Sequence, residues 1–410
     1  MAAAPSALFL AQADSVRVIA GVYTMSLLAT LPIGLAAVAA LVLRNANAEA
    51  RALVMRSAVV AMVVMLVGRQ LPLQWIAWVV PSFFATPLVA LGRLEVAAGS
   101  AAGVIDEAPL LVTSLLVVYV TGVVVALAPT VAASFTVRRR LRRSAVVASH
   151  DWSSLAAEVS AMLGVRRAVR VLVSPDAVVP MTWGFARPVI VVPTAALAWT
   201  AAERRMVLTH ELAHVRGADW LFNILARALC ALLWFHPGVW WIARNLRDEC
   251  ELACDDRVIA AGARRSDYAE LLVSVADARL RGVLPDAALA LSHRRGLRAR
   301  LAAVLDARHD VRPIARGWAA VAAMTTLSIA VPASVIQLAP TRDVLTSLMH
   351  DTQWQSRAYA VLGLARRADS IAVARSAAEL DPNPRVRAWA RYALAQNGAV
   401  RLTPVEPAKR

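Results

Sequence analysis

The stretch "LTHELAHVRGADW", Leu208–Trp220, contains two histidines four residues apart and a glutamate directly after the first. Residues at this spacing lie on one face of a helix, about one turn apart. The imidazoles of His210 and His214 can therefore reach a single ion at about 2.0–2.1 Å, the usual zinc–nitrogen distance. Glu211 lies beside them, where it can accept a proton from water made acidic by zinc. The alternative is an ordinary helix with two buried histidines and an exposed glutamate.

A second acidic stretch supplies the rest of a zinc site. Catalytic zinc needs a third protein ligand and one open position. The segment "DECELACDD" begins at Asp248, and it holds Glu251 and Asp255 one helical turn apart. Glu251 can be the third ligand, and Asp255 can accept a hydrogen bond from a histidine N–H. A solvated acidic face is the other interpretation, but the histidine motif favours a site for one Zn²⁺ per chain.

The composition indicates a membrane protein. The chain has 410 residues, 59% of them hydrophobic, with a mean hydropathy of +0.57. This is too apolar for an ordinary soluble protein and indicates membrane spans with one or two soluble domains. The net charge of +16 comes almost entirely from arginine, which in a membrane protein marks cytoplasmic loops. There is no nucleic-acid-binding signature, so we expect contact with the lipid bilayer and no direct nucleic-acid partner.

Four apolar stretches predict about four transmembrane helices. They are long enough to cross a bilayer. The second has no clear end, because the segment that follows is uncharged but contains three prolines. We interpret that segment, Gln70–Gly92, as part of the second span or as an interfacial or re-entrant piece. The four stretches are Val18–Leu43, one beginning near Ala52, Ala108–Val137 and Gly317–Thr341.

An arginine cluster predicts the orientation. The third stretch ends in "RRRLRR", Arg138–Arg143, and such clusters stay on the cytoplasmic side. The chain from there to Arg316 is then cytoplasmic. The N-terminus and the tail after Arg342 lie outside the inner or plasma membrane. A separate span within Gln70–Gly92 would reverse this assignment.

The fold class that follows is mainly α with a small β-sheet. Val169–Ser174 is expected to be a strand, and Gly184–Pro193 a turn followed by a short buried strand. The pattern is helical from Thr200 onward. The predicted domains are a membrane region with three spans at 1–143, a cytoplasmic zinc peptidase domain at 144–312, the fourth span at 313–341, a helical repeat region at 342–400 and a disordered C-terminus at 401–410.

The tail contains an internal repeat. The segments "DTQWQSRAYAVLGLA" from Asp351 and "DPNPRVRAWARYALA" from Asp381 align at a spacing of 30 residues. A two-helix repeat of this length is typical of a short α-solenoid. The repeat resembles HEAT repeats, which usually bind proteins, so an extracytoplasmic protein partner is expected.

Four short blocks carry a family resemblance. "PMTWGFARPVIVVP", "HELAH", "WFHP" and "ECELACD", in this order, resemble the membrane-embedded zinc peptidases of the BlaR/MecR type, peptidase family M56. Relatives of that family include the HtpX/Ste24-type peptidases. The resemblance covers roughly Val18–Gln337. It implies a gluzincin-type domain in which His210, His214 and Glu251 bind zinc and Glu211 is the general base.

The resemblance also concerns the substrate and the tail. It implies that the strand Val189, Ile190, Val191 and Val192 is an edge strand that pairs with an extended peptide. The tail departs from the named receptors, because a β-lactam-acylating sensor needs a Ser-x-x-Lys pair. The one lysine in the sequence is Lys409, and the residue three before it is Glu406.

Other polar residues near these blocks are interpreted as structural. We expect Asp219 to cap or orient the motif, and His236 to be structural because it lies among aromatic residues and precedes Pro237. We expect Tyr268 to be an ordinary, partly buried tyrosine; the alternative is an oxyanion donor near the site. The three cysteines, too few for a disulfide framework, are interpreted as reduced core residues.

The predicted function is that of a membrane-embedded zinc endopeptidase. By the resemblance it is signal-responsive and cleaves a cytoplasmic regulator, such as a transcriptional regulator, or itself. The connector Leu291–Pro313, whose start, "LSHRRG", is interpreted as a loop, is expected to be a charged surface helix along the inner leaflet; the hypothesis that the resemblance adds is self-cleavage within it. One alternative is constitutive quality-control proteolysis of the HtpX/Ste24 kind. Another is a non-catalytic zinc-containing scaffold acting through its repeats, which Glu211 disfavours because a structural site needs no base.

Overall fold

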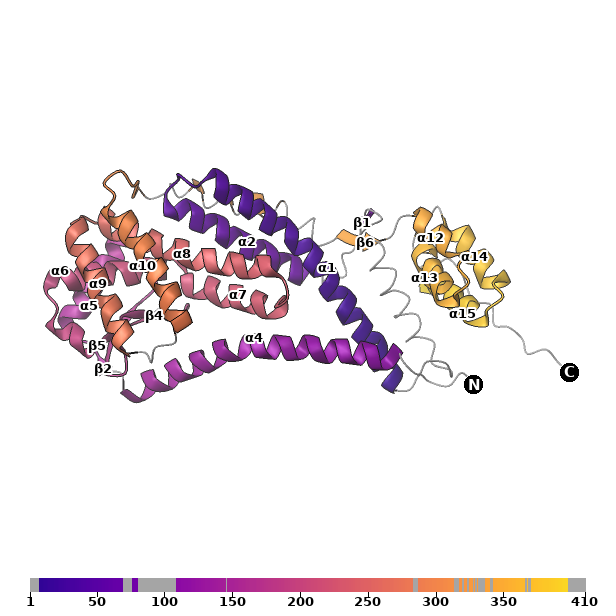
Figure 1. Cartoon of the computed structure of the whole chain (residues 1–410), viewed down its shortest axis with the longest axis horizontal. Coiled ribbons are helices and arrows are strands. Elements are labelled where there is room, and N and C mark those ends of the chain that lie inside the picture. The colour runs from indigo at the N-terminus through magenta and orange to yellow at the C-terminus, as the bar shows by residue number, and fades with distance from the viewer. Residues whose placement is uncertain are drawn as a thin grey trace. The chain divides into compact units, whose positions relative to one another are not determined.

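The structure, a computed structural model, is mostly helical, with a small mixed sheet (Figure 1). Contacts within the chain define two compact units. One comprises Met1–Leu28, Val67–Thr121 and Pro332–Arg410, and the other Ala29–Leu66 and Gly122–Val331. The residues that the structure describes are 7–68, 76–79, 108–144, 146–282, 287–312, 317–318, 321–322, 324–326, 328, 330, 336–339, 342–365, 367 and 370–396.

Three of the described helices are long and apolar enough to cross a membrane, as the first three predicted spans require. They are α1 (Ala7–Val42), α2 (Ala48–Gly68) and α4 (Ala108–Ser144). Their apolar windows are Gly21–Val42, Ala48–Gly68 and Thr113–Arg139.

The fourth predicted span differs from the prediction at its end. Its described residues between 317 and 330 are helical, but β6 (Ile336–Ala339) is a strand, so no helix continues to Thr341. β6 pairs in parallel with β1 (Ile76–Val79), which lies inside the proline-containing segment Gln70–Gly92. The rest of that segment lies outside the described residues, as does the predicted disordered end at 401–410.

A four-stranded sheet forms the β part of the second unit. Its strands are β2 (Val146–Val147), β3 (Arg170–Ser174), β4 (Met181–Trp183) and β5 (Val189–Pro193), in the order β2-β3-β5-β4. The predicted edge position of β5 is wrong, because β5 pairs in parallel with β3 and antiparallel with β4. All five of its residues are buried, which suits an interior strand. The edge of the sheet on this side is β4.

Helices α5 (His150–Leu163) and α6 (Ala201–Gly217) pack together, and both contribute to the core that includes β3 and β5. The start of α6 is set by a capping box, in which Thr200 and Glu203 exchange side-chain-to-backbone hydrogen bonds. A short 3-10 helix, η1 (Thr194–Ala198), links β5 to α6.

The remaining helices of this unit follow α6. α7 (Asp219–Leu232) and α8 (Pro237–Ala260) form a helical hairpin (Figure 1). α9 (Arg265–Gly282) and α10 (Ala287–Leu305) then pack against each other, and α10 also packs on α8. α10 includes residues 291–296, so the expected loop at "LSHRRG" is helical instead.

Four short helices follow β6 in the first unit. They are α12 (Arg342–Leu348), α13 (Trp354–Ala365), α14 (Ile371–Leu380) and α15 (Pro384–Gln396). α13 and α15 begin 30 residues apart, at the spacing of the sequence repeat. α13, α14 and α15 share one core built mainly of alanine, with Val361, Val386 and Leu394. Such small side chains let the helices approach closely.

Candidate metal centre

Helix α6 has an apolar face and a polar face, because its apolar residues recur at helical intervals. Leu208, Leu212 and Val215 recur at helical intervals, and all three belong to the core shared with α5 and the sheet. His210 and His214 therefore lie on another face of the helix, and their side chains are only 12% and 16% exposed. This face meets α8, with which α6 packs.

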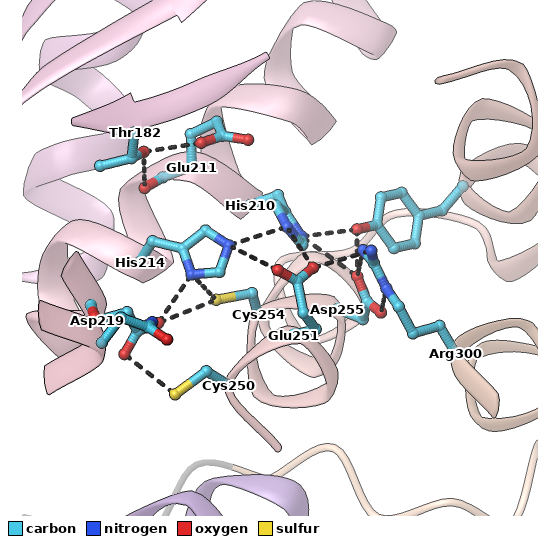
Figure 2. A network of polar contacts seen from close by, with 12 residues as sticks. Thr182, His210, Glu211, His214, Asp219, Cys250, Glu251, Cys254, Asp255 and Arg300 are labelled. Atoms are coloured by element: carbon cyan, nitrogen blue, oxygen red, sulfur yellow. Dashed lines mark hydrogen bonds and ion pairs between the residues drawn. The ribbon is translucent and has the colours of Figure 1, made fainter. Parts of the chain in front are cut away.

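The three residues predicted as metal ligands converge. His210 Nε2 and His214 Nε2 are 3.2 Å apart. Glu251 of α8 brings Oε2 to 3.7 Å from His210 Nε2 and Oε1 to 3.8 Å from His214 Nε2. The three ligand atoms lie within 4.8 Å of one another, so they surround one shared point (Figure 2). Two imidazole nitrogens and one carboxylate form a donor set that zinc prefers.

Carboxylates hold the other nitrogen of each imidazole. His214 Nδ1 lies 2.7 Å from Asp219 Oδ2, and His210 Nδ1 lies 3.2 Å from Asp255 Oδ1. Tyr268 adds its hydroxyl, 2.6 Å from Asp255 Oδ1 and 2.9 Å from His210 Nδ1. An N–H held at Nδ1 leaves the Nε2 lone pair free for a metal, so both imidazoles turn the same atom toward the shared point.

Arg300 of α10 ties the two carboxylates of α8 together. Its guanidinium donates to Asp255 at 2.7 Å through both Nε and Nη2, and its Nη1 lies 2.9 Å from Glu251 Oε2. Burial tends to raise the pKa of Glu251, but Arg300 and both histidines outweigh burial and hold it well below 4.5. Glu251 is therefore a carboxylate at neutral pH, as a metal ligand must be.

The same contacts act on His210. Burial tends to lower its pKa, but its contacts with Asp255 and Glu251 raise the pKa to about 10. At neutral pH the imidazole therefore carries a second proton, at Nε2 in addition to the one at Nδ1, and the Nε2 lone pair becomes free for a metal only when this second proton is released.

Asp219 connects the site to membrane helix α2. Its Oδ1 accepts a hydrogen bond from Arg56 Nη2 at 2.6 Å, while its Oδ2 contacts His214. Burial tends to raise the pKa of Asp219, but His214 and Arg56 outweigh it and hold the pKa below 3.8. Asp219 is thus an ionised partner that orients His214, which is one of the two structural roles, capping or orienting the motif, that the sequence predicted.

A tight turn brings Asp219 under His214. Ala218, between α6 and α7, has φ 56°, in the left-handed region that non-glycine residues seldom adopt. A Cβ at Gly217 would lie 2.7 Å from both Arg56 Nη2 and Asp219 Oδ1. The glycine therefore leaves the space through which the ion pair forms.

Two buried thiols lie on the same side of the site. Cys254 Sγ is 3.3 Å from His214 Nδ1, and Cys250 Sγ is 3.3 Å from Asp219 Oδ1. Burial, reinforced by Asp219, raises the pKa of both thiols. They are neutral and unbridged, in agreement with their interpretation as reduced core residues.

Glu211 faces the edge of the sheet. It is 6% exposed, and Thr182 Oγ1 of β4 lies 2.7 Å from its Oε2 and 3.0 Å from its backbone oxygen (Figure 2). Thr182 therefore fixes both the side chain and the helix backbone at the position of the predicted base. By contrast, β5, which was expected to meet the substrate, is shielded by β4.

Sequence reasoning missed four contributors to this site. Thr182, Arg56 and Arg300 are 29, 163 and 45 residues away in sequence from the groups that they contact, so no local pattern indicates them. Tyr268 was interpreted as partly buried and ordinary, yet it is 2% exposed and contacts His210. His236 has the expected structural role, since it caps α8 by accepting a hydrogen bond from Gly238 N.

A histidine pair on one helix, a glutamate on the next and adjacent spanning helices together are typical of a membrane-associated metallopeptidase. The family model described as BlaR1 peptidase M56 matches residues 95–304, just over half of the chain. The chain therefore belongs to the peptidase M56 family, a family of metallopeptidases.

The chain is similar to parts of two longer proteins, one of them named as a regulatory protein. The chain is 29% identical over 142 residues to the regulatory protein BlaR1 of Bacillus licheniformis, which covers 35% of this chain and 24% of that protein. It is 31% identical over 81 residues to the methicillin resistance protein MecR1 of Staphylococcus aureus, covering 20% of this chain and 14% of the relative. The matched part therefore spans less than a quarter of these relatives' lengths.

Proposed function

We propose that the chain is a membrane-embedded zinc endopeptidase in which His210, His214 and Glu251 hold one zinc ion. The observation that carries the proposal is the convergence of two Nε2 atoms and one carboxylate, each imidazole being held at Nδ1 by a second carboxylate. Zinc, when bound, polarises the scissile carbonyl and makes water acidic enough to be deprotonated at neutral pH.

In this proposal Glu211 is the general base. Its carboxylate takes a proton from the attacking water and gives it to the amine of the leaving fragment. Thr182 holds the carboxylate through Oε2, which restricts the rotamers from which the proton can be transferred. Asp255, Asp219 and Tyr268 position the histidines without contacting the substrate.

The substrate is proposed to be an extended peptide that adds to β4. A peptide can pair with an edge strand through its backbone, and β4 is the edge of this sheet nearest Glu211. This replaces the role first assigned to β5. Phe185, in the turn between β4 and β5, is 39% exposed and is available to contact substrate side chains.

The proposed topology has the peptidase domain, 144–312, in the cytoplasm and the tail after the fourth span outside. Arg138–Arg143 supports this orientation. The parallel pairing of β1 with β6 requires these two strands to lie on the same side of the membrane, which fits four spans in either orientation, so the orientation rests on the arginine cluster. A reporter fused after Arg143 should behave as cytoplasmic, and one fused after Asp343 as external; the reverse pattern contradicts the topology.

The proposed role is regulated proteolysis of a cytoplasmic regulator or of the chain itself. The name of the relative BlaR1, a regulatory protein that is similar over part of the peptidase region, supports this role. The tail is proposed to be a HEAT-like repeat region, 342–400, that binds an extracytoplasmic protein. Its 30-residue helix spacing and shared core support this assignment.

The test of the function uses the full chain purified in lipid nanodiscs. We expect about one zinc per chain, because the site has three protein ligands for one ion. We also expect cleavage of a peptide library; a chelator should abolish this cleavage, and added zinc should restore it. Zinc binding without cleavage of any peptide would favour the scaffold alternative. Absence of zinc from a folded protein would contradict the proposed site itself.

A further inference from the structure

The tip of the α7–α8 hairpin is unusually apolar for part of a soluble domain. From Ala228 to Ala243 the sequence reads "ALCALLWFHPGVWWIA", which has no aspartate, glutamate, lysine or arginine. Arg227 and Arg244 flank this segment in the sequence, and both side chains are exposed. We call Ala228–Ala243 the hairpin tip.

Large apolar side chains of the hairpin tip are exposed on the protein surface. Phe235, Trp240 and Trp241 are 44%, 42% and 36% exposed. Clustered exposed aromatic rings mark a protein or membrane contact, and tryptophan is favoured at the membrane interface.

The hairpin tip contacts two of the candidate membrane spans. A Cβ at Gly122 of α4 would lie 2.3 Å from the Trp234 ring, so the indole packs directly on that glycine. A Cβ at Gly238 would lie 2.9 Å from Ile33 Cγ2 of α1. Gly122 and Ile33 both lie inside the apolar windows of their spans. The tip therefore lies beside segments that are long and apolar enough to cross a membrane.

Hydrogen bonds within the hairpin satisfy several polar groups of its turn, although Trp234 Nε1 is buried without a partner. Trp240 Nε1 donates to the carbonyl of Trp234 at 2.8 Å, and Gly238 N donates to His236 Nδ1 at 3.2 Å. His236 N donates in turn to the carbonyl of Leu233 at 2.8 Å. Backbone in a hydrocarbon environment needs such internal partners, because lipid tails offer none.

We propose that the hairpin tip inserts into the acyl region of the bilayer, with Arg227 and Arg244 at the lipid headgroups. The α7 arm contributes five helical residues, Ala228–Leu232, and the α8 arm seven, Pro237–Ala243, which is about 8 Å and about 10 Å of helix at 1.5 Å per residue. Both lengths fit inside one leaflet, which is about half of the 30 Å hydrocarbon core. Exposed Arg247, one turn from Arg244, strengthens the basic rim.

The inserted tip fixes the height of the candidate metal centre above the membrane. Glu251 follows Arg244 by seven residues on α8, and Asp219 precedes Arg227 by eight on α7. Both distances are about 10–12 Å along a helix axis. If the proposed peptidase function holds, the preferred substrates carry their cleavage site close to the cytoplasmic face of the bilayer.

Spin labelling in proteoliposomes tests the insertion without requiring peptidase activity. Phe235→Cys carries the label in the hairpin tip, and Met162→Cys, 45% exposed on α5, is the matched water-facing control. The three native cysteines are buried, so wild type gives the labelling background. Oxygen concentrates in lipid, whereas a water-soluble nickel chelate stays outside it.

We expect the oxygen-to-nickel collision ratio to be several-fold higher at position 235 than at position 162. Equal ratios would overturn the proposal, and so would a label at 235 that neither reagent reaches, since that would mean protein covers the tip. If Phe235→Cys does not fold, Trp241→Cys gives the same readout. Because the ratio does not depend on zinc or cleavage, its failure is separable from failure of the proposed function.

Discussion

Arg56, in candidate membrane span α2, donates a hydrogen bond to Asp219 at 2.6 Å, and the other oxygen of Asp219 lies 2.7 Å from His214 Nδ1. A membrane helix is thus two hydrogen bonds away from a proposed metal ligand. The same helix pairs with α8 through Arg51 and Glu249 at 2.8 Å. Any displacement of α2 must therefore either move Asp219 or break its contact with Arg56.

The first prediction concerns this link. Arg56→Gln should weaken zinc affinity about tenfold, the lower end of the 10–100-fold range for groups behind a metal ligand. Arg56→Lys should recover part of the loss. Competition against a chelator measures the affinity. Arg51→Gln is the matched control, since it breaks an α2 ion pair that does not touch Asp219; equal losses in both variants would contradict the link.

Gly217→Ala should also weaken zinc affinity, because its added methyl group would crowd the Arg56–Asp219 ion pair. The added Cβ would lie 2.7 Å from both Arg56 Nη2 and Asp219 Oδ1, so the ion pair must separate. The zinc affinity should fall as in Arg56→Gln, and the double variant should show little further loss, because both changes break one interaction. Ala218→Gly is the control, since it keeps the pair and suits φ 56°. Additive losses would show that the two residues act independently.

Arg300 is expected to keep Glu251 ionised. Removing its charge in Arg300→Gln lets the pKa of Glu251 rise toward its usual range, because burial then has less opposition. Protonation competes with zinc, so zinc release on acidification should begin at a higher pH than in wild type. Zinc occupancy measured against pH tests this, with Arg298→Gln, an exposed arginine on α10, as control. Identical curves for Arg300→Gln and wild type would show that Arg300 does not keep Glu251 ionised.

The residues of the two short motifs, including Glu251 and Asp255, were predictable from sequence, and their partners on distant helices and strands were not. His210, Glu211 and His214 follow from helical spacing within a single turn. Arg300 reaches Asp255 only because α10 packs on α8, which no short pattern encodes.

The sheet shows the same limit. An apolar run such as Val189–Val192 indicates a buried strand but not which strands flank it, so β5 was mistaken for an edge. The pairing of Ile76 with Ile336 joins segments 260 residues apart, and no pattern in either local sequence predicts it.

The tail offers a prediction about pH. Arg357 of α13 holds Asp381, which precedes α15, at 2.9 and 3.1 Å. Burial tends to raise the pKa of Asp381, but Arg357 and the backbone N–H of Asn383 hold it below 3.8. Because the folded-state pKa is the lower one, the stabilisation is present above about pH 3.8 and is lost as the pH falls through the folded-state value.

Asp381→Asn should remove this stabilisation at neutral pH, at a cost of about 1–3 kcal/mol for hydrogen bonds to a charged group. Amide exchange across α13–α15 of the full chain, corrected for the intrinsic pH dependence, measures it. Wild-type protection should decline below pH 3.8, whereas that of the variant should start low and change little. A parallel decline in both proteins would mean that another group is responsible.

The central claim, that Glu211 is a base and not a ligand, is tested most directly by measuring zinc content and peptide cleavage on the same preparations. Glu211→Gln keeps the shape of the side chain, and its amide can still meet Thr182. We predict wild-type zinc content with cleavage reduced by about 10²–10⁴-fold, the usual contribution of general acid–base catalysis. Glu251→Gln should instead lose zinc and activity together. Cleavage at the wild-type rate in Glu211→Gln, or loss of zinc in step with its activity, would contradict the account.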